Sequence, residues 1–473
     1  MEKKINKVML INPSNTMPKD SIRRLATPLG FLYVGAVLKE KGYEVNILDS
    51  TCKGYFNTKI KGDYVTYGLD DEDIIKNIES YEPDIVGITS MFSAHQENAL
   101  HHCDLVKKVN RNTPVVLGGI HPSLLPEETI KHKSVDYVLV GEGEYSFLEL
   151  LENPKSKQIY YSEKISDLDS IPLPARELID MEDYINIGAP YAPFPRKERT
   201  AQILTSRGCP FNCVFCSTKG YWGREFRARS VGNIIEEVEE LVDNYGIEEL
   251  QFSDDNMTVD KNRANELFTR LKDYDLSWCT PHGLMMKTVD EKMIKLMAES
   301  GAYQLTFAIE SGSRRVLKEI IHKPVPPKNH VKHLLDVCHD HDIQVHGLFV
   351  TGFPGERREE IEQTLKYPFD VGFDSASYFI ANPLPGSELY EQCKQKGYLK
   401  KHGTMDFKSA EIIIPKNSPD YIMPRRELEK LVDDKTREFN EYSKSKHPER
   451  WNKKFKKFLE KHNGESDIEG RVT

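Results

Sequence analysis

The stretch "RGCPFNCVFCST", residues 207–218, places three cysteines on one short segment. Cys209, Cys213 and Cys216 are spaced C-x₃-C-x₂-C, and the other five cysteines of the chain form no such cluster. Because cysteine binds metal as the thiolate, this spacing predicts a metal site. Zinc sites and [4Fe–4S] clusters normally take four ligands, and no further Cys or His follows within the next 30 residues. Either a distant residue such as Cys279 completes a zinc knuckle, or one metal position stays open.

Residues 200–400, which surround this motif, alternate strand-like and helical patterns. Six runs predict strands: "TAQILTS", "IEELQFSDD", "LSWCTPHG", "AYQLTFAIES", "DIQVHGLFVTG" and "DSASYFIANPLPG". Segments with apolar residues at helical spacing lie between them. Six β-α units predict a partial (βα)₆ barrel, short of a complete (βα)₈ barrel. The cysteines follow the first strand, at the barrel end where such folds carry their chemistry.

Residues 1–150 contain a separate β-α series. The runs "KVMLIN", "YEVNILD", "DIVGITS", "TPVVLGG" and "DYVLVGEGE" are continuously apolar and rich in β-branched residues, which is typical of strands buried on both faces. With helical patterns between them, they predict an α/β domain with a doubly wound, Rossmann- or flavodoxin-like parallel sheet. Ligands of such sheets bind beyond the carboxyl ends of the strands.

The remaining segments and the composition set the context. The Pro-rich residues 151–199 predict a linker, and residues 401–473 predict a helical C-terminal region. A net charge of -9 argues against a nucleic-acid partner. The sequence shows neither a signal peptide nor a run of about 18 apolar residues, so we expect a cytoplasmic protein. In a reducing compartment, clustered cysteines indicate metal or redox chemistry rather than disulfides.

The motif C-x₃-C-x-Φ-C, with Phe215 before the last cysteine, resembles the radical S-adenosylmethionine (SAM) superfamily over residues 200–390. The resemblance implies that Cys209, Cys213 and Cys216 hold a [4Fe–4S] cluster whose open iron binds SAM. It also implies reductive cleavage of SAM to a 5′-deoxyadenosyl radical, fed by an external reductant of the flavodoxin or ferredoxin type. By the same resemblance, SAM would contact Phe215, Asp254, Asp255, Glu310, Ser311, Gly352 and Pro383.

Each of these positions has a structural alternative. Asp255 or Asn256 could cap the following helix, Glu310 could pair with Arg314, and Gly352 could simply make a turn. The aromatic and arginine residues that follow the cysteines could shape a pocket, although capping and surface pairing are commoner uses for such side chains. They are Tyr221, Trp222, Arg224, Arg227 and Arg229.

The N-terminal series, with "GGIHPS", "VGEGE" and "IPLPAREL" in that order, resembles the cobalamin-binding domain of the B12-dependent radical SAM proteins. The resemblance implies corrinoid contacts on the strand-end loops, at Asn12, Ser90, Gly118, Gly119, His121, Glu142 and Gly143. Residues 1–190 lack the D-x-H-x-x-G motif whose histidine replaces the nucleotide base below cobalt. We therefore expect base-off cobalamin without a histidine ligand. The alternative is a flavodoxin-like module that binds no corrinoid.

Together, the two resemblances imply a cobalamin-dependent radical SAM methyltransferase. The adenosyl radical would activate an unactivated carbon, or phosphorus, of a small-molecule or lipid-like substrate, and methylcobalamin would supply the methyl group. The alternatives are a cyclase or ring-rearranging enzyme without methyl transfer and, outside the enzymes, an iron–sulfur electron carrier or a corrinoid-binding module. Substrate, acid–base residues and oligomeric state are not specified.

The C-terminal tail leaves a further choice open. Residues 444–461 hold seven Lys and one Arg against two Glu, with aromatic residues at helical spacing. Such a basic amphipathic helix could lie on the inner face of an anionic membrane. It could equally pack its apolar stripe on the barrel and leave its lysines in water.

Overall fold

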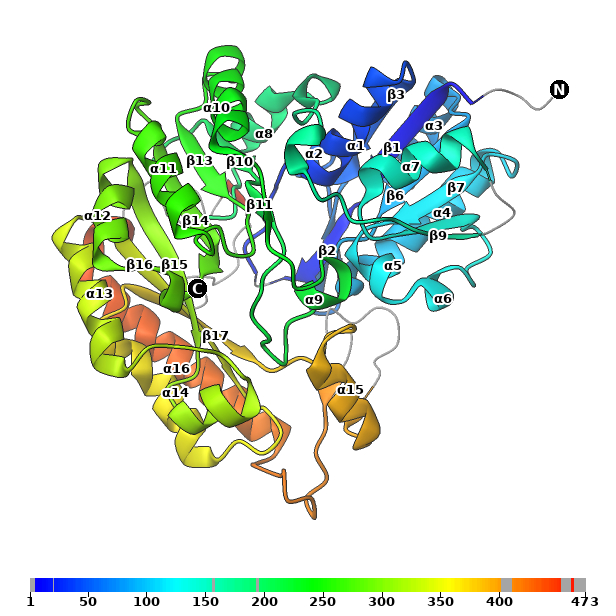
Figure 1. The fold of residues 1–473 in the computed structure, drawn as a ribbon. Helices are drawn as coiled ribbons and strands as arrows, with labels where there is room; N and C mark the ends of the chain where they lie inside the picture. The colour runs from blue at the N-terminus through cyan, green and yellow to red at the C-terminus, as the bar shows by residue number, and fades with distance from the viewer. Residues whose placement is uncertain are drawn as a thin grey trace.

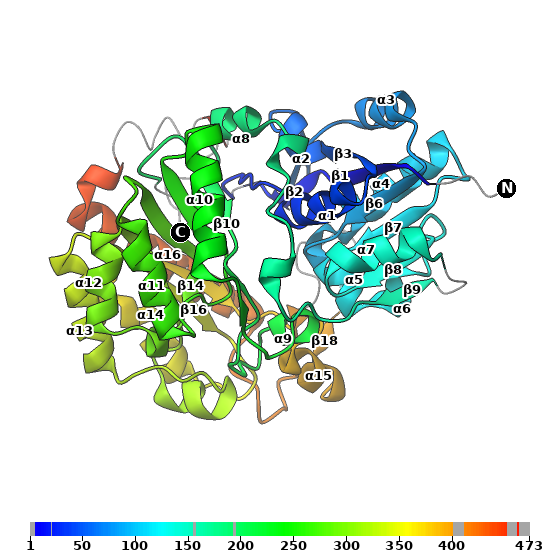
Figure 2. The same cartoon turned by 45° about the horizontal axis from the view of Figure 1, so that its top comes forward.

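A computed structural model describes residues 5–19, 21–154, 158–192, 195–400, 411–451 and 461–462. It shows two α/β units side by side, with the N-terminal unit in blue and cyan and the second in green to orange (Figure 1). Figure 2 shows the same two units, turned so that the top of the molecule comes forward. The segment that carries the three cysteines, with β11 (Ser206–Arg207) and α9 (Thr218–Tyr221), runs between the two units.

The N-terminal unit is built on a parallel six-stranded sheet with the order β3-β1-β6-β7-β8-β9. The strands are β3 (Glu44–Asp49), β1 (Lys7–Asn12), β6 (Ile85–Thr89), β7 (Val115–Gly118), β8 (Tyr137–Val140) and β9 (Ile159–Tyr161). The first five follow the flavodoxin-like order 2-1-3-4-5, which places the switch point between β1 and β6. This confirms the predicted doubly wound domain.

Helices cover both faces of this sheet because its strands are apolar on both sides. The helices α1 (Leu29–Glu40) and α7 (Gly143–Glu152) pack on the face that carries Val8 and Leu10. The helices α3 (Asp71–Tyr81) and α4 (Gln96–Val109) pack on the face that carries Met9 and Ile11. A small antiparallel sheet of β2 (Asn15–Pro18), β5 (Tyr64–Tyr67) and β4 (Thr58–Lys61) lies beside them, together with α2 (Ser50–Lys53), α5 (Ile120–Leu124) and α6 (Pro126–Thr129).

The stretch predicted as a linker, residues 151–199, is more structured than expected. Its strand β9 pairs with β8 and completes the N-terminal sheet. It also forms two 3₁₀ turns, Leu168–Ser170 and Arg176–Leu178, and the helix α8 (Met181–Ile187). The prolines interrupt these elements without preventing them from packing. The exact domain limits remain a prediction.

The second unit is a curved parallel sheet whose six strands follow sequence order, as a partial (βα)₆ barrel requires. They are β10 (Thr200–Ile203), β13 (Glu249–Phe252), β14 (Ser277–Leu284), β15 (Ala302–Glu310), β16 (Gln344–Thr351) and β17 (Ser375–Ile380). The helices are α10 (Val231–Tyr245), α11 (Lys261–Leu271), α12 (Glu291–Glu299), α13 (Lys328–Asp340), α14 (Arg358–Val371) and α15 (Glu388–Gln395), with a short π-helix at Val316–Ile320.

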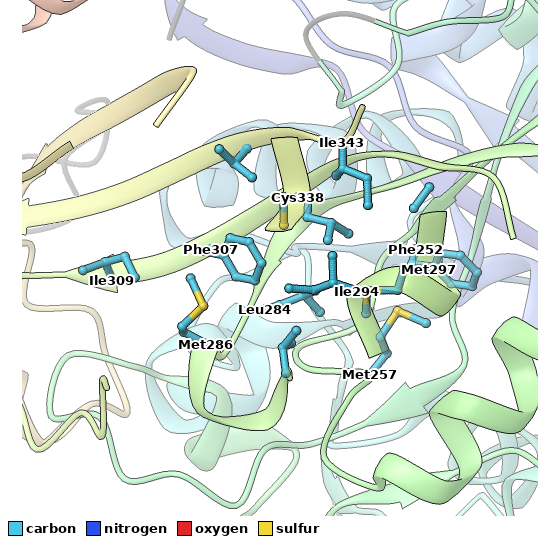
Figure 3. Close-up of a cluster of buried hydrophobic side chains, with 14 of the residues drawn as sticks. Phe252, Met257, Leu284, Met286, Ile294, Met297, Phe307, Ile309, Cys338 and Ile343 are labelled. Atoms are coloured by element: carbon cyan, nitrogen blue, oxygen red, sulfur yellow. The ribbon is translucent and has the colours of Figure 1, made fainter. Parts of the chain in front are cut away.

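The main core lies between the outer face of this sheet and its helices. Figure 3 shows part of it, where Phe252, Phe307 and Ile309 of the strands meet Ile294 and Met297 of α12. Nearby, the Trp278 ring stacks on Phe268 at 5.1 Å between ring centres. Because this face takes the apolar residues, the alternate residues of each strand point into the barrel.

The C-terminal region is helical where it is described, as predicted. The helix α16 (Arg425–Lys446) packs on β17 and α14 through Phe439, Leu428 and Val432. A hairpin of β18 (Leu399–Lys400) and β19 (Glu411–Ile412) precedes it, and a 3₁₀ turn (Pro448–Trp451) follows.

The tail beyond that turn lies mostly outside the described residues. Where the chain is described again, Lys461 Nζ donates to the Asn186 carbonyl at 2.8 Å, and Tyr55 Oη lies 3.0 Å from His462 Nδ1. These two residues thus rest on the protein, and the membrane contact predicted for 444–461 finds no support there. Among the described residues, no helix is both long enough and apolar enough to cross a lipid bilayer.

Candidate active site between the two units

The cysteine loop is partly exposed and follows the first strand of the barrel. All eight cysteines are free; Cys209, Cys213 and Cys216 keep accessible surface, and the other five are buried. Burial raises the pKa of the Cys209 and Cys213 thiols to about 11, so the protein alone holds them protonated at neutral pH. Thiolates at these positions require cations beside them, which iron supplies.

The position of Cys279 bears on the choice between the two metal readings. In the described part of the chain, no three His, Cys, Asp or Glu side chains gather closely enough to hold a single metal ion. Cys279, the candidate fourth zinc ligand, is fully buried in a separate cluster with Ala192 and Tyr303. A [4Fe–4S] cluster places each thiolate on a different iron, so its cysteines stand further apart. The buried position of Cys279 argues against its completing a zinc knuckle with the loop.

Backbone constraints shape the loop. Gly208 has φ +84°, and a Cβ built there would lie 2.3 Å from the Glu225 carbonyl oxygen, so only glycine fits. Val214 N donates to the Ile321 carbonyl at 3.1 Å, and Leu389 N donates to the Val214 carbonyl at 2.9 Å. The Phe215 ring rests 5.8 Å from the Phe353 ring, between ring centres. These contacts tie the loop to three segments of the barrel, those that follow β15, β16 and β17.

The two predicted acids after β13 serve the loop in different ways. Asp254 is buried and accepts hydrogen bonds from Thr205 Oγ1 at 2.7 Å and Ser206 Oγ at 2.5 Å. It therefore anchors the segment that leads into the cysteines, and its contact with SAM stays a prediction. Asp255 is less buried and accepts from Gly208 N at 3.3 Å. Neither acid caps α11, whose cap is Asp260.

Glu310 forms a buried ion pair that the sequence did not reveal. Its Oε1 lies 2.9 Å from Lys323 Nζ, and both side chains are at most 7% exposed. Burial lowers the pKa of Lys323, but the charge of Glu310 and its hydrogen bond outweigh this effect and raise the pKa overall. The expected alternative partner, Arg314, donates instead to the Val325 carbonyl. A cation thus stands beside the cysteines with its counter-ion at a strand end, and Glu310 itself adopts φ +69°.

The other predicted SAM residues have mainly structural contacts. Ser311 Oγ lies 3.0 Å from Thr364 Oγ1 of α14 and is fully buried. Gly352 has φ +84°, and a Cβ there would lie 2.7 Å from Leu428 of α16, so this glycine allows helix packing. Pro383 is buried in the loop after β17, next to Asn382, whose Oδ1 is buried without a partner among the described residues.

Four of the predicted corrinoid residues lie together at the carboxyl ends of β6 and β7. His121 N donates to the Ser90 carbonyl at 3.0 Å, and Ser90 N donates to the Gly118 carbonyl at 2.8 Å. Gly119 has φ +105°, and a Cβ there would lie 2.8 Å from the Ser90 carbonyl oxygen. Gly119 therefore allows the backbone after β6 to pack closely against it. This contact explains the glycine more directly than the predicted approach of a corrinoid tail.

This group fits a bound corrinoid. Ser90 Oγ and His121 Nε2 are buried and have no hydrogen-bond partner among the described residues. Buried polar atoms are rarely left so in a folded protein, and the amide side chains of a corrin would satisfy them. Burial lowers the pKa of His121 to about 4, and its Nδ1 lies 2.8 Å from Ser93 Oγ. Asn12 ends β1 on the other side of the switch point.

Glu142 pairs with arginines of the second unit, and its corrinoid contact stays a prediction. Its oxygens lie 2.5 Å from Arg207 Nη1 and 2.7 Å from Arg227 Nη1, and it accepts from Ile165 N at 2.9 Å. Glu144 adds a second carboxylate, 2.5 Å from Arg207 Nη2. All four charged side chains are at most 5% exposed. The neighbouring Gly143 packs on Val34 of α1.

The two arginines mark the ends of the cysteine loop. Arg207 and Arg227 are paired across the antiparallel strands β11 and β12 (Arg227–Ala228). Two cations side by side repel each other, so the carboxylates Glu142 and Glu144 are needed to neutralise them. We refer to these four residues as the interdomain ion cluster. It fixes the segment after β8 against the two strands, β11 and β12, that flank the cysteine loop.

Comparison with known proteins supports both units. The B12 binding domain family matches residues 19–151, and the radical SAM superfamily matches residues 203–367. The chain is 37% identical to cytidylyl-2-hydroxyethylphosphonate methyltransferase of Streptomyces wedmorensis over 87% of each protein. It is 33% identical to an uncharacterized methyltransferase of Pyrococcus horikoshii over 85% of this chain and 87% of that protein.

The fold also matches a solved structure. The cobalamin-dependent SAM radical enzyme OxsB aligns with a TM-score of 0.70 over 97% of this chain and 71% of that chain, at 16% identity. At 16% identity this match is evidence for the fold alone. The evidence for the family comes from the sequence identity to the two methyltransferases. The chain therefore belongs to the cobalamin-dependent radical SAM methyltransferases, enzymes that use a [4Fe–4S] cluster, SAM and cobalamin.

Proposed function

We propose that the enzyme transfers a methyl group to an unactivated carbon of a small, polar, phosphorus-containing molecule. The observation that carries this proposal is the 37% identity, across 87% of both chains, to a methyltransferase named for a cytidylyl phosphonate. The structure agrees with it, because the interdomain ion cluster fixes the segment after β8 against the strands that flank the cysteine loop.

In this proposal the chain's own residues divide the work. Cys209, Cys213 and Cys216 hold the cluster, and Lys323 supplies a fixed positive charge beside them. Ser90 and His121 offer polar atoms to the corrinoid. When bound, these cofactors would supply hydrogen abstraction from carbon and a methyl group. An external one-electron reductant of the flavodoxin or ferredoxin type completes the system.

Anaerobic reconstitution tests the proposal. The purified protein would be supplied with iron, sulfide and cobalamin, then with SAM, reductant and cytidylyl-2-hydroxyethylphosphonate. We expect cluster absorbance, a corrinoid spectrum, 5′-deoxyadenosine and a methylated product. Cys213→Ala should lose the cluster and SAM cleavage, whereas Cys338→Ala, a matched change of a cysteine in the core, should keep both. Persistent SAM cleavage in Cys213→Ala would contradict the assignment of the loop, and a wild-type enzyme that makes 5′-deoxyadenosine without methylating would contradict methyl transfer.

A further inference from the structure

The inner face of the barrel sheet is polar and partly open. The register between β15, β16 and β17 aligns Thr306 with His346 and His346 with Ser375, so these side chains share one face. The alternate residues Leu305, Phe307 and Phe349 belong to the helix-covered core. Further along the inner face, Ala308 and Leu348 keep accessible surface, and Phe379 is 51% exposed. The barrel interior is thus not filled by its own side chains.

The end of β14 turns onto this face. The pairing of β14 with β15 is irregular between Thr280 and Leu284, and Gly283 has φ +100° within that irregularity. A Cβ on Gly283 would lie 3.8 Å from Thr306 Cγ2 and 3.5 Å from Leu348 Cδ1. The bulge breaks the regular alternation of side chains at this point, and His282 immediately precedes Gly283.

His282 combines an accessible side chain with a lowered pKa. Its side chain is exposed, yet burial by the surrounding protein lowers its pKa below the ordinary value. The two observations agree if the ring lines a recess that a ligand can enter. In its neutral form the imidazole offers one donor and one acceptor. The ring of Tyr191 lies 5.2 Å away, at 64°.

Tyr191 connects this wall to a cation from the N-terminal unit. Arg24 Nη1 donates to the Pro190 carbonyl at 2.9 Å, immediately before Tyr191. Burial lowers the pKa of Arg24 to about 10, although the neighbouring tyrosines, including Tyr191, oppose this. Arg24 therefore stays positive at neutral pH. The segment that carries Tyr191 is fixed in turn by Leu25 N, which donates to the Ala189 carbonyl at 2.7 Å.

Two buried oxygens on the inner face have no partner within the described chain. They are Thr306 Oγ1 and Gln304 Oε1, on side chains that are 1% and 3% exposed. A hydroxyl or amide left without a hydrogen bond in the interior is costly, so such groups usually meet a ligand or water. Thr306 adjoins Gly283 and hence the His282–Tyr191 wall.

We propose that Arg24, Tyr191, His282 and Thr306 form the substrate-binding wall of the enzyme, and that this wall takes the phosphonate or phosphate group of the substrate. A guanidinium with hydroxyl and imidazole donors is the set that suits an oxyanion, and a partly dehydrated site strengthens each bond. Leu348 and Phe379 on the same face would take the carbon part. This assignment rests on the proposed function, because it concerns the substrate of the same site.

Equilibrium binding to the reconstituted holoenzyme tests the wall, with cytidylyl-2-hydroxyethylphosphonate and uncharged cytidine as calorimetric probes. We expect the wild-type enzyme to prefer the phosphonate. Arg24→Gln should weaken its binding roughly 10- to 150-fold, as the loss of a charge-assisted hydrogen bond does. Arg24→Lys should recover part of the loss. Arg426→Gln, which removes an exposed arginine on α16, should bind like wild type.

Thr306→Val keeps the shape of the side chain. It is the second test variant, to be used if Arg24→Gln fails to load its cofactors. It should weaken phosphonate binding about 5-fold. Unchanged binding in either loaded variant, or equal binding of both probes by wild type, overturns the proposal. Measurements on the wild-type enzyme distinguish failure of the substrate-binding wall from failure of the proposed function. Phosphonate binding without methylation contradicts methyl transfer alone. Methylation of another substrate without phosphonate binding contradicts the wall alone.

Discussion

Replacing Glu142 by glutamine is the sharpest test of the interdomain ion cluster. The carboxylate lies within 2.7 Å of two arginines and also accepts from Ile165 N, with its side chain 3% exposed. Glutamine keeps one acceptor oxygen, but its NH₂ group would face a guanidinium donor, and the cluster would retain an uncompensated cation. Removal of one partner from a buried ion pair costs about 3–5 kcal/mol.

This cost should appear as local opening between β11 and β12. Because a multi-domain chain does not unfold in two states, amide hydrogen exchange of residues 203–229 is the appropriate measurement. A loss of about 3–5 kcal/mol corresponds to exchange faster by roughly 150- to 4,000-fold. Glu291→Gln is the matched control, since it removes an exposed carboxylate paired with Lys295 on α12. Such surface pairs contribute about 1 kcal/mol or less.

A double variant separates charge balance from mere disruption. Glu142→Gln with Arg227→Met leaves Arg207 and Glu144 as a neutral pair, so it should exchange more slowly than Glu142→Gln alone. If Glu142→Gln exchanges like Glu291→Gln, the cluster does not hold the loop. If the double variant loses the full sum of the two single losses, the four residues do not act as one unit.

Three further predictions concern the barrel. Burial raises the pKa of Glu356 to about 8, so this group binds a proton in the folded protein that the unfolded chain releases near pH 4.5. The stability of the fold should therefore fall as the pH rises from about 4.5 to 8. Glu356→Gln should flatten this slope in thermal melts recorded across that range, whereas an unchanged slope would assign it to other groups. Lys323→Met leaves Glu310 buried without its cation and should cost about 3–5 kcal/mol, while the double variant with Glu310→Gln should be less damaged. Amide hydrogen exchange of β15 and of the loop that carries Lys323 checks the order, and a double variant that exchanges as fast as the single one would contradict the pair. Gly208→Ala should sharply lower the iron and sulfide content because its Cβ meets the Glu225 carbonyl. Gly397→Ala, also at positive φ but in open space, should lower the stability by only about 1 kcal/mol and keep the iron. Equal iron content in both variants would show that the loop can shift.

Much of the fold was predictable because it rests on local patterns. The continuous apolar runs of the N-terminal strands require cover on both faces, and α1 and α7 lie opposite α3 and α4, as that pattern demands. The strand β9 escaped prediction because it has three residues, of which only Tyr160 is buried. The strand forms because it pairs with β8, and such a tertiary contact cannot be predicted from local β-propensity.

The cysteines were equally predictable, since the metal chemistry lies in the spacing of one short segment. The partners of the acidic residues were not. Glu142 meets arginines 65 and 85 positions away, and the ion pair of Glu310 depends on Lys323 in a loop without a motif. An acid at a strand end carries the same sequence signal whether it faces a cofactor or a buried cation. Burial and charge pairing, which only the folded chain displays, separate the two.

The paired arginines at the ends of the cysteine loop have a consequence for how the enzyme is made. The carboxylates that neutralise them belong to the N-terminal domain, which leaves the ribosome first and can fold before the later residues emerge. When Arg207 and Arg227 appear, Glu142 and Glu144 already stand at the strand end that receives them. The folded N-terminal domain thus positions the two strands that flank the cysteine loop. Iron and sulfide are then inserted into a loop whose two ends are already paired.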